Sequence, residues 1–117
     1  SPIDTSNYSA AINNTIYTGS WRDFCFDYFE KNPVPNSTNI KDFYDDFKVD
    51  LSMIKSYFKK NGESIDQFNS QELIDLEWSV KIELSSYYYS DQSRYILNTY
   101  KDDDVKRAIK EIMNQSL

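Results

Sequence analysis

The part of the chain after Gly62 contains neither glycine nor proline, and this restricts the fold more than any other feature. All 117 residues together include only two glycines and three prolines. Tight turns between strands depend on glycine, proline and a few small polar residues. An all-β architecture is therefore disfavoured, and the length fits one domain with one core.

The most regular apolar pattern runs from Asn39 to Gly62. Its apolar residues are spaced alternately four and three apart, as on one stripe of an α-helix; they are Ile40, Tyr44, Phe47, Leu51, Ile54 and Phe58. Asn39 can cap the first turn, with Asp42 three residues later, and Gly62 suits the left-handed position after the last turn. The sequence predicts one central helix here, with Leu51 in its buried face.

An earlier helix is predicted from Ser20, which has Asp23 three residues later, to about Asn32. Pro33 disfavours helical angles at the residue before it and so marks the end. The buried face of this helix is expected to be aromatic and comprises Trp21, Phe24, Cys25, Tyr28 and Phe29. Residues 1–19 are expected to form a partly ordered arm with a loosely attached helical turn or two, and residues 20–117 the single helical domain.

Residues 69–88 support two interpretations. Alternation of apolar and polar residues from Leu76 to Leu84 is typical of a half-buried strand. Asn69 with Glu72 forms a capping box, however, and apolar residues follow it at helical spacing. Helix is favoured because residues 90–93 lack the glycine of a good hairpin turn. The predicted fold is thus mostly α, a compact bundle of four to five helices; the alternative is α+β, with a hairpin at about 76–88 and 94–100.

The last two elements are predicted as a short helix over 94–100 and a separate final helix. Three consecutive aspartates, Asp102 to Asp104, suit the start of a helix, where the dipole favours negative charge. The apolar stripe of this final helix comprises Val105, Ala108, Ile109, Ile112 and Met113.

The chain lacks the residues on which most enzyme chemistry depends. It has no histidine, which is the commonest general base and transition-metal ligand, and its single cysteine is Cys25. Cys25 is expected to be a buried hydrophobe, and the aspartates of 42–50 and 102–104 a solvated face and a helix cap. We expect no catalytic residue, no metal site and no cofactor, and therefore no enzyme.

Negative charge is concentrated in one segment. Residues 63–92 contain seven acidic residues and one basic residue, which accounts for the whole net charge of −6. Nucleic-acid binding is disfavoured because it depends on neutralising phosphates, and no stretch is apolar enough to cross a membrane. Carboxylates beside exposed rings fit a surface that docks on a basic protein. The predicted partner-binding residues are Glu72, Asp75, Glu77, Trp78, Glu83, Tyr88, Tyr89 and Asp91.

The sequence therefore favours a non-catalytic, acidic protein-binding module. Its most concrete form is an inhibitor or immunity-type protein that neutralises a basic toxin or nuclease. The alternative is a helical structural or adaptor subunit of a larger or homo-oligomeric assembly. A lone cysteine favours the cytoplasm, with a signal peptide removed by processing as the open alternative; the oligomeric state is left open.

Overall fold

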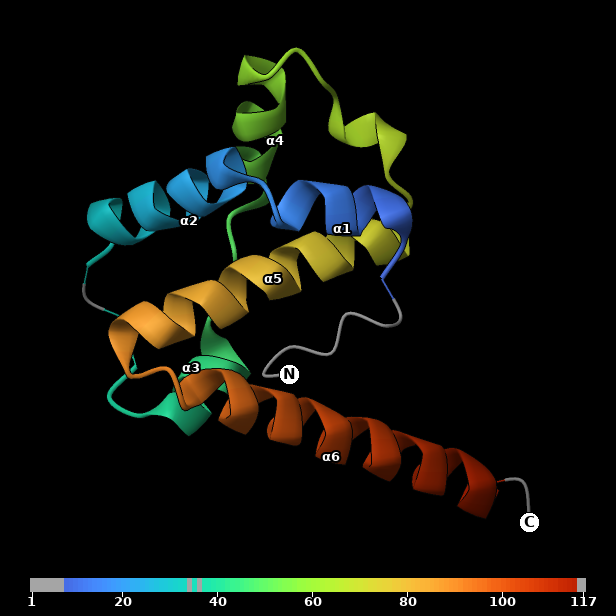
Figure 1. Ribbon diagram of the computed structural model, residues 1–117. Helices are drawn as coiled ribbons and strands as arrows, with labels where there is room; N and C mark the ends of the chain where they lie inside the picture. The colour runs from blue at the N-terminus through green and yellow to red at the C-terminus, as the bar shows by residue number, and fades with distance from the viewer. Residues whose placement is uncertain (1–7, 34, 36, 116–117) are drawn as a thin grey trace.

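The computed structural model describes residues 8–33, 35 and 37–115, and Figure 1 shows that they are arranged as packed helices. These residues form six α-helices and one short 3₁₀-helix, with no strand among them. The prediction of a mostly α fold is confirmed, with more helices than expected. The elements are α1 (Ala10–Ile16), α2 (Gly19–Lys31), α3 (Ile40–Asp46), α4 (Leu51–Lys60), η1 (Ile65–Gln67), α5 (Ser70–Tyr88) and α6 (Ser93–Gln115).

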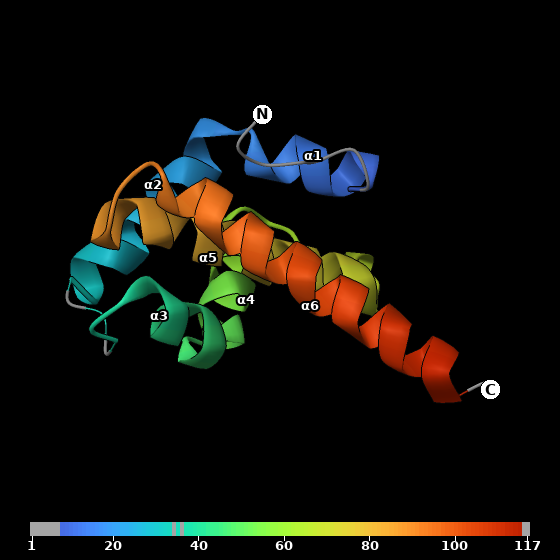
Figure 2. The ribbon, with the colours of Figure 1, turned by 90° about the horizontal axis from the view of Figure 1, so that it is seen from below.

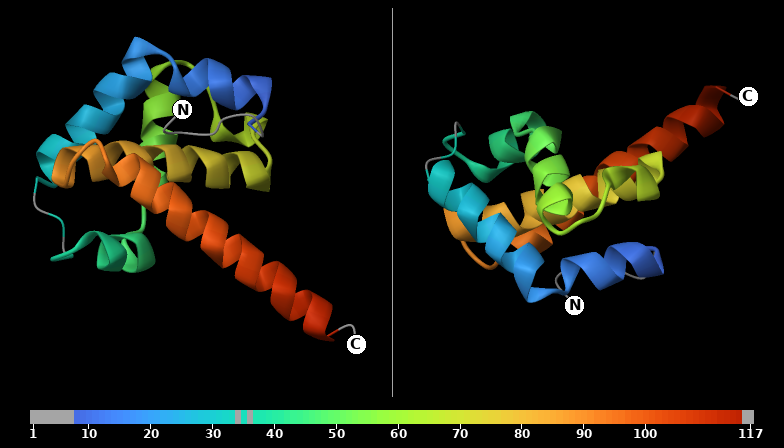
Figure 3. Two further views of the ribbon diagram at one scale, coloured as in Figure 1. Left: turned by 60° about the horizontal axis from the view of Figure 1, so that its bottom comes forward. Right: turned by 90° about the horizontal axis from the view of Figure 1, so that it is seen from above.

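The central element is α5, which packs against α1, α2 and α6 (Figures 1 and 3). It begins with the predicted capping box: Asn69 Oδ1 accepts from the backbone N–H of Glu72, and Glu72 returns the bond to the N–H of Asn69. The helical interpretation of this segment is confirmed. Two buried serines, Ser79 and Ser85, donate to carbonyls of their own helix three residues earlier, so that neither hydroxyl is left without an acceptor.

The core contains both aliphatic side chains and aromatic rings. Of the buried apolar residues that the structure describes, seven are aliphatic and five are aromatic. Many more rings are half-buried at the edge, among them Phe24 and Tyr57, whose centroids lie 5.1 Å apart. Trp21 and Phe58 are themselves buried, with ring centroids 6.1 Å apart. Rings therefore contribute to the buried core as well as to its half-buried edge.

The N-terminal segment contributes to this core. Within the predicted arm of residues 1–19, α1 is capped by Ser9 and buries Ile12 completely. Ser9 also donates from Oγ to the Glu72 carboxylate at 2.5 Å, which ties the start of α1 to the start of α5. Residues 1–7 lie outside the described part.

The predicted single helix over 39–62 is wrong, because the chain leaves helical geometry at Phe47 and α4 begins only at Leu51. Asp50 caps α4 by accepting from the backbone N–H of Ser52 at 2.9 Å. On the other side of the break, a side chain of α5 binds the end of α3. The Lys81 ammonium donates to the carbonyls of Tyr44 (2.6 Å) and Phe47 (3.0 Å) at the end of α3.

The break changes which residues are buried. Leu51 was expected in the core but stands in the first turn of α4 with 38% of its surface exposed, whereas Phe43, Ile54 and Phe58 are buried. The predicted end of this segment is confirmed. Gly62 has a φ of +73°, and its N–H and that of Glu63 bond back to the carbonyls of Lys59 and Phe58, which is a Schellman motif.

The last two predicted elements are one helix. α6 runs without interruption from Ser93 to Gln115, so Asp102 to Asp104 lie in mid-helix and do not form its N-terminal turn. Only the first half is anchored: its buried residues are Ser93 and Leu97. Figures 1, 2 and 3 agree that the second half extends beyond the other helices. None of the described helices combines the length and apolarity that a bilayer crossing requires.

Candidate protein-interaction surface

The predicted partner-binding residues are spread along the whole of α5 and the loop after it. Glu72 is used as a cap and accepts from Ser9, as described above. Asp75, one turn later, is buried and accepts from Gln71 Nε2 at 3.0 Å. Asp91 is exposed beyond the other end of the helix. Asp75 is therefore withdrawn from the surface, and Glu72 and Asp91 lie at opposite ends of the helix.

Three further predicted residues make contacts within the fold. Glu83 forms an ion pair of 2.9 Å with Arg94 of α6. Tyr88 donates its hydroxyl to the carbonyl of Asn32, and Tyr89 donates to that of Ser37 at 3.2 Å. The two tyrosine hydrogen bonds hold the end of α5 to the segment that follows α2. All three contacts give their side chains a structural role, and partner binding by these residues stays a prediction.

Glu77 and Trp78 are brought together in a cleft of about 390 Å³ between α3, α5 and α6. The Trp78 ring carries the ammonium of Lys101 4.3 Å from its centroid. Burial lowers the pKa of Lys101, and nearby carboxylates of Asp75 and Asp102 act in the opposite direction. Aromatic and charged groups thus meet in this cleft, but its tryptophan face is already occupied by a cation of the same chain.

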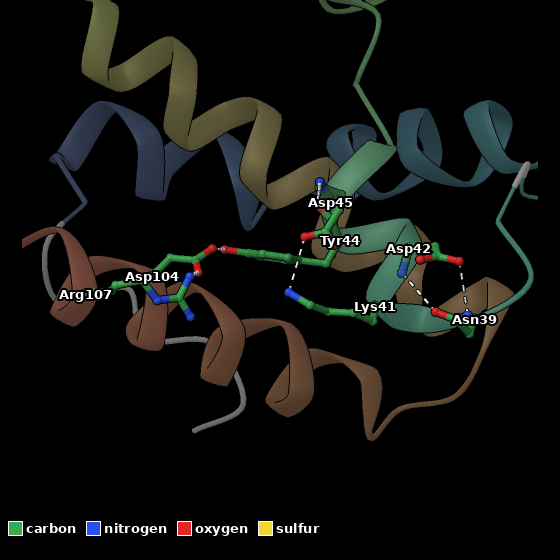
Figure 4. A network of polar contacts seen from close by, with 8 residues as sticks. Asn39, Lys41, Asp42, Tyr44, Asp45, Asp104 and Arg107 are labelled. Atoms are coloured by element: carbon green, nitrogen blue, oxygen red, sulfur yellow. Dashed lines mark hydrogen bonds and ion pairs between the residues drawn. The ribbon is translucent and has the colours of Figure 1, made fainter.

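On the opposite side of the cleft, a hydrogen bond joins α3 to α6 (Figure 4). Tyr44 extends from α3 and donates its hydroxyl to Asp104 Oδ2 at 2.6 Å, and Asp104 also pairs with Arg107 at 3.4 Å. Burial and the Asp104 carboxylate raise the pKa of Tyr44. Lys81 also lines the cleft, but its ammonium is held by two carbonyls. Tyr44, Lys81 and Asp104 are therefore engaged in contacts within the fold.

Groups that could hold a metal or act as a nucleophile are scarce elsewhere. The described residues contain no cluster of three or more histidine, cysteine, aspartate or glutamate side chains suited to a metal ion. Cys25 is completely buried in α2, and burial raises the pKa of its thiol to about 12, with Glu83 acting in the same direction. A thiol in this state is not a nucleophile near neutral pH.

We expect Cys25 to resist thiol reagents until the protein unfolds. In the native protein at pH 8, labelling should be slower than in denaturant by about a thousandfold or more, because it requires an opening of the core. The rate of reaction with a chromogenic disulfide, followed with and without denaturant, measures this difference. Equal rates in the two conditions would place the thiol at the surface.

The clearest candidate for an interaction surface is the distal part of α6. We define the distal stripe as Val105, Ile109 and Met113, which are successively four residues apart and therefore lie on one side of the helix. Their exposed fractions are 51%, 53% and 64%, and Ile112 beside them is 62% exposed. Single exposed apolar residues are ordinary, but a contiguous exposed row on a projecting helix is typical of a binding surface.

Comparisons of the chain with protein-family models, with curated proteins and with solved structures find no match.

The sequence did contain the signal for the distal stripe, since the spacing of the apolar residues identifies the apolar side of the last helix. What the sequence lacked was any sign that no other element of the described structure packs over that side.

Proposed function

We propose that this chain is a non-catalytic protein-binding module whose contact surface is the distal stripe. The observation that carries the proposal is the exposure of Val105, Ile109 and Met113 on the half of α6 that extends past the body. Helices that present an apolar side in this way are common binding elements, because burial of each large side chain contributes about 1.5–3 kcal/mol.

A photo-crosslinking amino acid placed at Ile109 tests this function in the native host. We expect a specific protein adduct at this position, identified by mass spectrometry. The matched position is Leu51, an aliphatic residue that is also exposed but lies on α4. Absence of an adduct at Ile109, or the same adducts at both positions, would contradict the assignment of the surface.

A second candidate is an acidic inhibitor or immunity-type protein that covers a basic toxin or nuclease. Its support is the charge distribution: residues 105–115 contain three basic residues and one acidic residue, a net charge of +2, so the remainder carries −8. A body with this charge would steer a basic partner toward itself, and the on-rate would fall as salt rises. Charge-reversal variants that measure this on-rate must use acidic residues that form no ion pair within the fold. Glu83 is therefore unsuitable, because it pairs with Arg94.

A further inference from the structure

A second cleft, of about 440 Å³, lies between α2 and α4. Two hydrogen bonds join the helices that form its walls. Near the start of α2, the hydroxyl oxygens of Ser20 and Tyr57 lie 2.8 Å apart. Nearer its end, the Tyr28 hydroxyl accepts from the N–H of Asp50, the cap of α4, at 3.1 Å. The cleft is therefore part of the packed fold, and its volume is within the range of small-molecule sites.

Three of the residues that line this cleft are aromatic: Phe24, Tyr28 and Tyr57. Phe24 contacts both tyrosines, with ring centroids 5.1 Å from Tyr57 and 6.4 Å from Tyr28. The ring planes are inclined by 47° and 86°, so the three rings do not form one flat stack. Aromatic rings set at angles around a cavity are typical of sites for quaternary ammonium groups, because the face of each ring attracts positive charge.

Cations of the chain itself lie over other rings. Within the described residues, the ammonium groups of Lys41, Lys81 and Lys101 lie over rings of α3, α5 and α6. Two exposed carboxylates of α2, Asp23 and Asp27, line the cleft beside its rings, and the ion pairs of the described residues all involve other carboxylates. A cation that enters this cleft thus meets both aromatic rings and carboxylates that no lysine or arginine neutralises.

The cleft also contains positive charge. Lys31 in the last turn of α2 and Lys60 in the last turn of α4 line it, and both are exposed. The ion pairs of the described structure involve other basic side chains. Two carboxylates and two ammonium groups are therefore available in one cleft, and a ligand that carries both a cation and an anion complements them better than a ligand of one sign.

We propose that the cleft between α2 and α4 binds a small zwitterion with a quaternary ammonium group and an anionic group, as in phosphocholine. The ammonium group lies against the three rings and the two carboxylates of α2. The anionic group is bound by a lysine in the last turn of α2 or α4. This site lies apart from the distal stripe of α6 and goes beyond the proposed function.

NMR titration of the full chain with phosphocholine tests the proposal. We expect the ring signals of Phe24, Tyr28 and Tyr57 to shift, with a Kd of about 0.1–1 mM for a ligand of this size. 3,3-Dimethylbutyl phosphate has the same shape with carbon in place of the charged nitrogen, and it should bind at least about tenfold more weakly. Ring signals that do not shift at about 10 mM phosphocholine, or equal affinities for the two compounds, would overturn the proposal.

Substitution of the carboxylates tests the cation side. Asp23→Asn with Asp27→Asn should weaken phosphocholine binding at least about tenfold, since it removes both negative charges beside the rings. Asp102→Asn with Asp103→Asn is the matched control, because it removes the same charge from exposed positions of α6 and should leave the Kd unchanged. Circular dichroism establishes that both variants keep their helices. Equal Kd values for the two double variants would contradict a role for the α2 carboxylates and overturn the proposal.

Substitution of the lysines tests the anion side. The wild type should bind phosphocholine at least about threefold more tightly than choline, and Lys31→Met with Lys60→Met should abolish this difference. Inorganic phosphate alone should leave the ring signals in place, since it has no group for the rings. A preference for phosphocholine that survives in the double variant, or ring shifts caused by phosphate alone, would overturn the assignment of a zwitterion.

Discussion

Replacing Leu76 with alanine should lower the free energy of unfolding by about 2–5 kcal/mol. Leu76 is completely buried in α5, the helix against which α1, α2 and α6 pack. Truncation removes the Cγ methine and both Cδ methyl groups of a completely buried side chain and leaves a cavity between the helices that pack there. Chemical denaturation followed by circular dichroism measures the loss.

The same substitution at Leu51 is the matched control. With 38% of its surface exposed, Leu51 loses much less burial when truncated, and we expect a change below about 1 kcal/mol. Similar losses at both positions would show that the first turn of α4 is part of the core, as a single helix over 39–62 requires.

Replacing Lys81 with methionine should destabilise the fold by about 1–3 kcal/mol. The change keeps the volume of the side chain but leaves the carbonyls of Tyr44 and Phe47 without the donor that now satisfies both. Lys48→Met is the matched control, since Lys48 lies in the same break but is exposed. Equal unfolding free energies for the two variants would contradict a special role for Lys81.

The cost of Lys81→Met should grow with pH. Burial lowers the pKa of Lys81 from 10.5 to about 8, and the Lys48 ammonium acts in the same direction. Between these two values the unfolded chain binds more protons at this site than the folded protein, so the contribution of Lys81 to stability rises with pH. It is present in full above 10.5 and is lost as pH falls through 8. Denaturation of both proteins at pH 7 and pH 9.5 measures the difference.

The sequence predicted the elements whose boundaries depend on local chemistry. The capping box of Asn69 and Glu72, the stop at Asn32 before Pro33 and the left-handed Gly62 each involve residues within a few positions of one another. Local signals of this kind also identified the apolar side of the final helix.

The helix boundaries that were predicted wrongly depend on contacts between residues far apart in the sequence. The stripe over 39–62 continues at helical spacing through Phe47, whereas contacts that hold the break come from residues distant in the sequence: Lys81 donates to the carbonyl of Phe47, and Tyr28 accepts from the N–H of Asp50. Asp102 to Asp104 suit a helix start, yet the helix continues from Ser93, and Tyr44 of α3 binds Asp104. Composition also cannot show that Asp75 is buried or that Glu83 is paired with Arg94, and partner binding by the predicted residues stays a prediction.

The anchored half of α6 also affects the free energy of the binding that we propose for the distal stripe. A helix needs an unfavourable nucleus before it can propagate, and isolated helices shorter than about 12–15 residues are marginal in water. Here Leu97 and Asp104, fixed against the body, hold the turns that serve as a nucleus, and residues 105–115 only extend it. The tip is therefore ordered before any partner arrives, and association need not supply the conformational entropy that a disordered tail would lose.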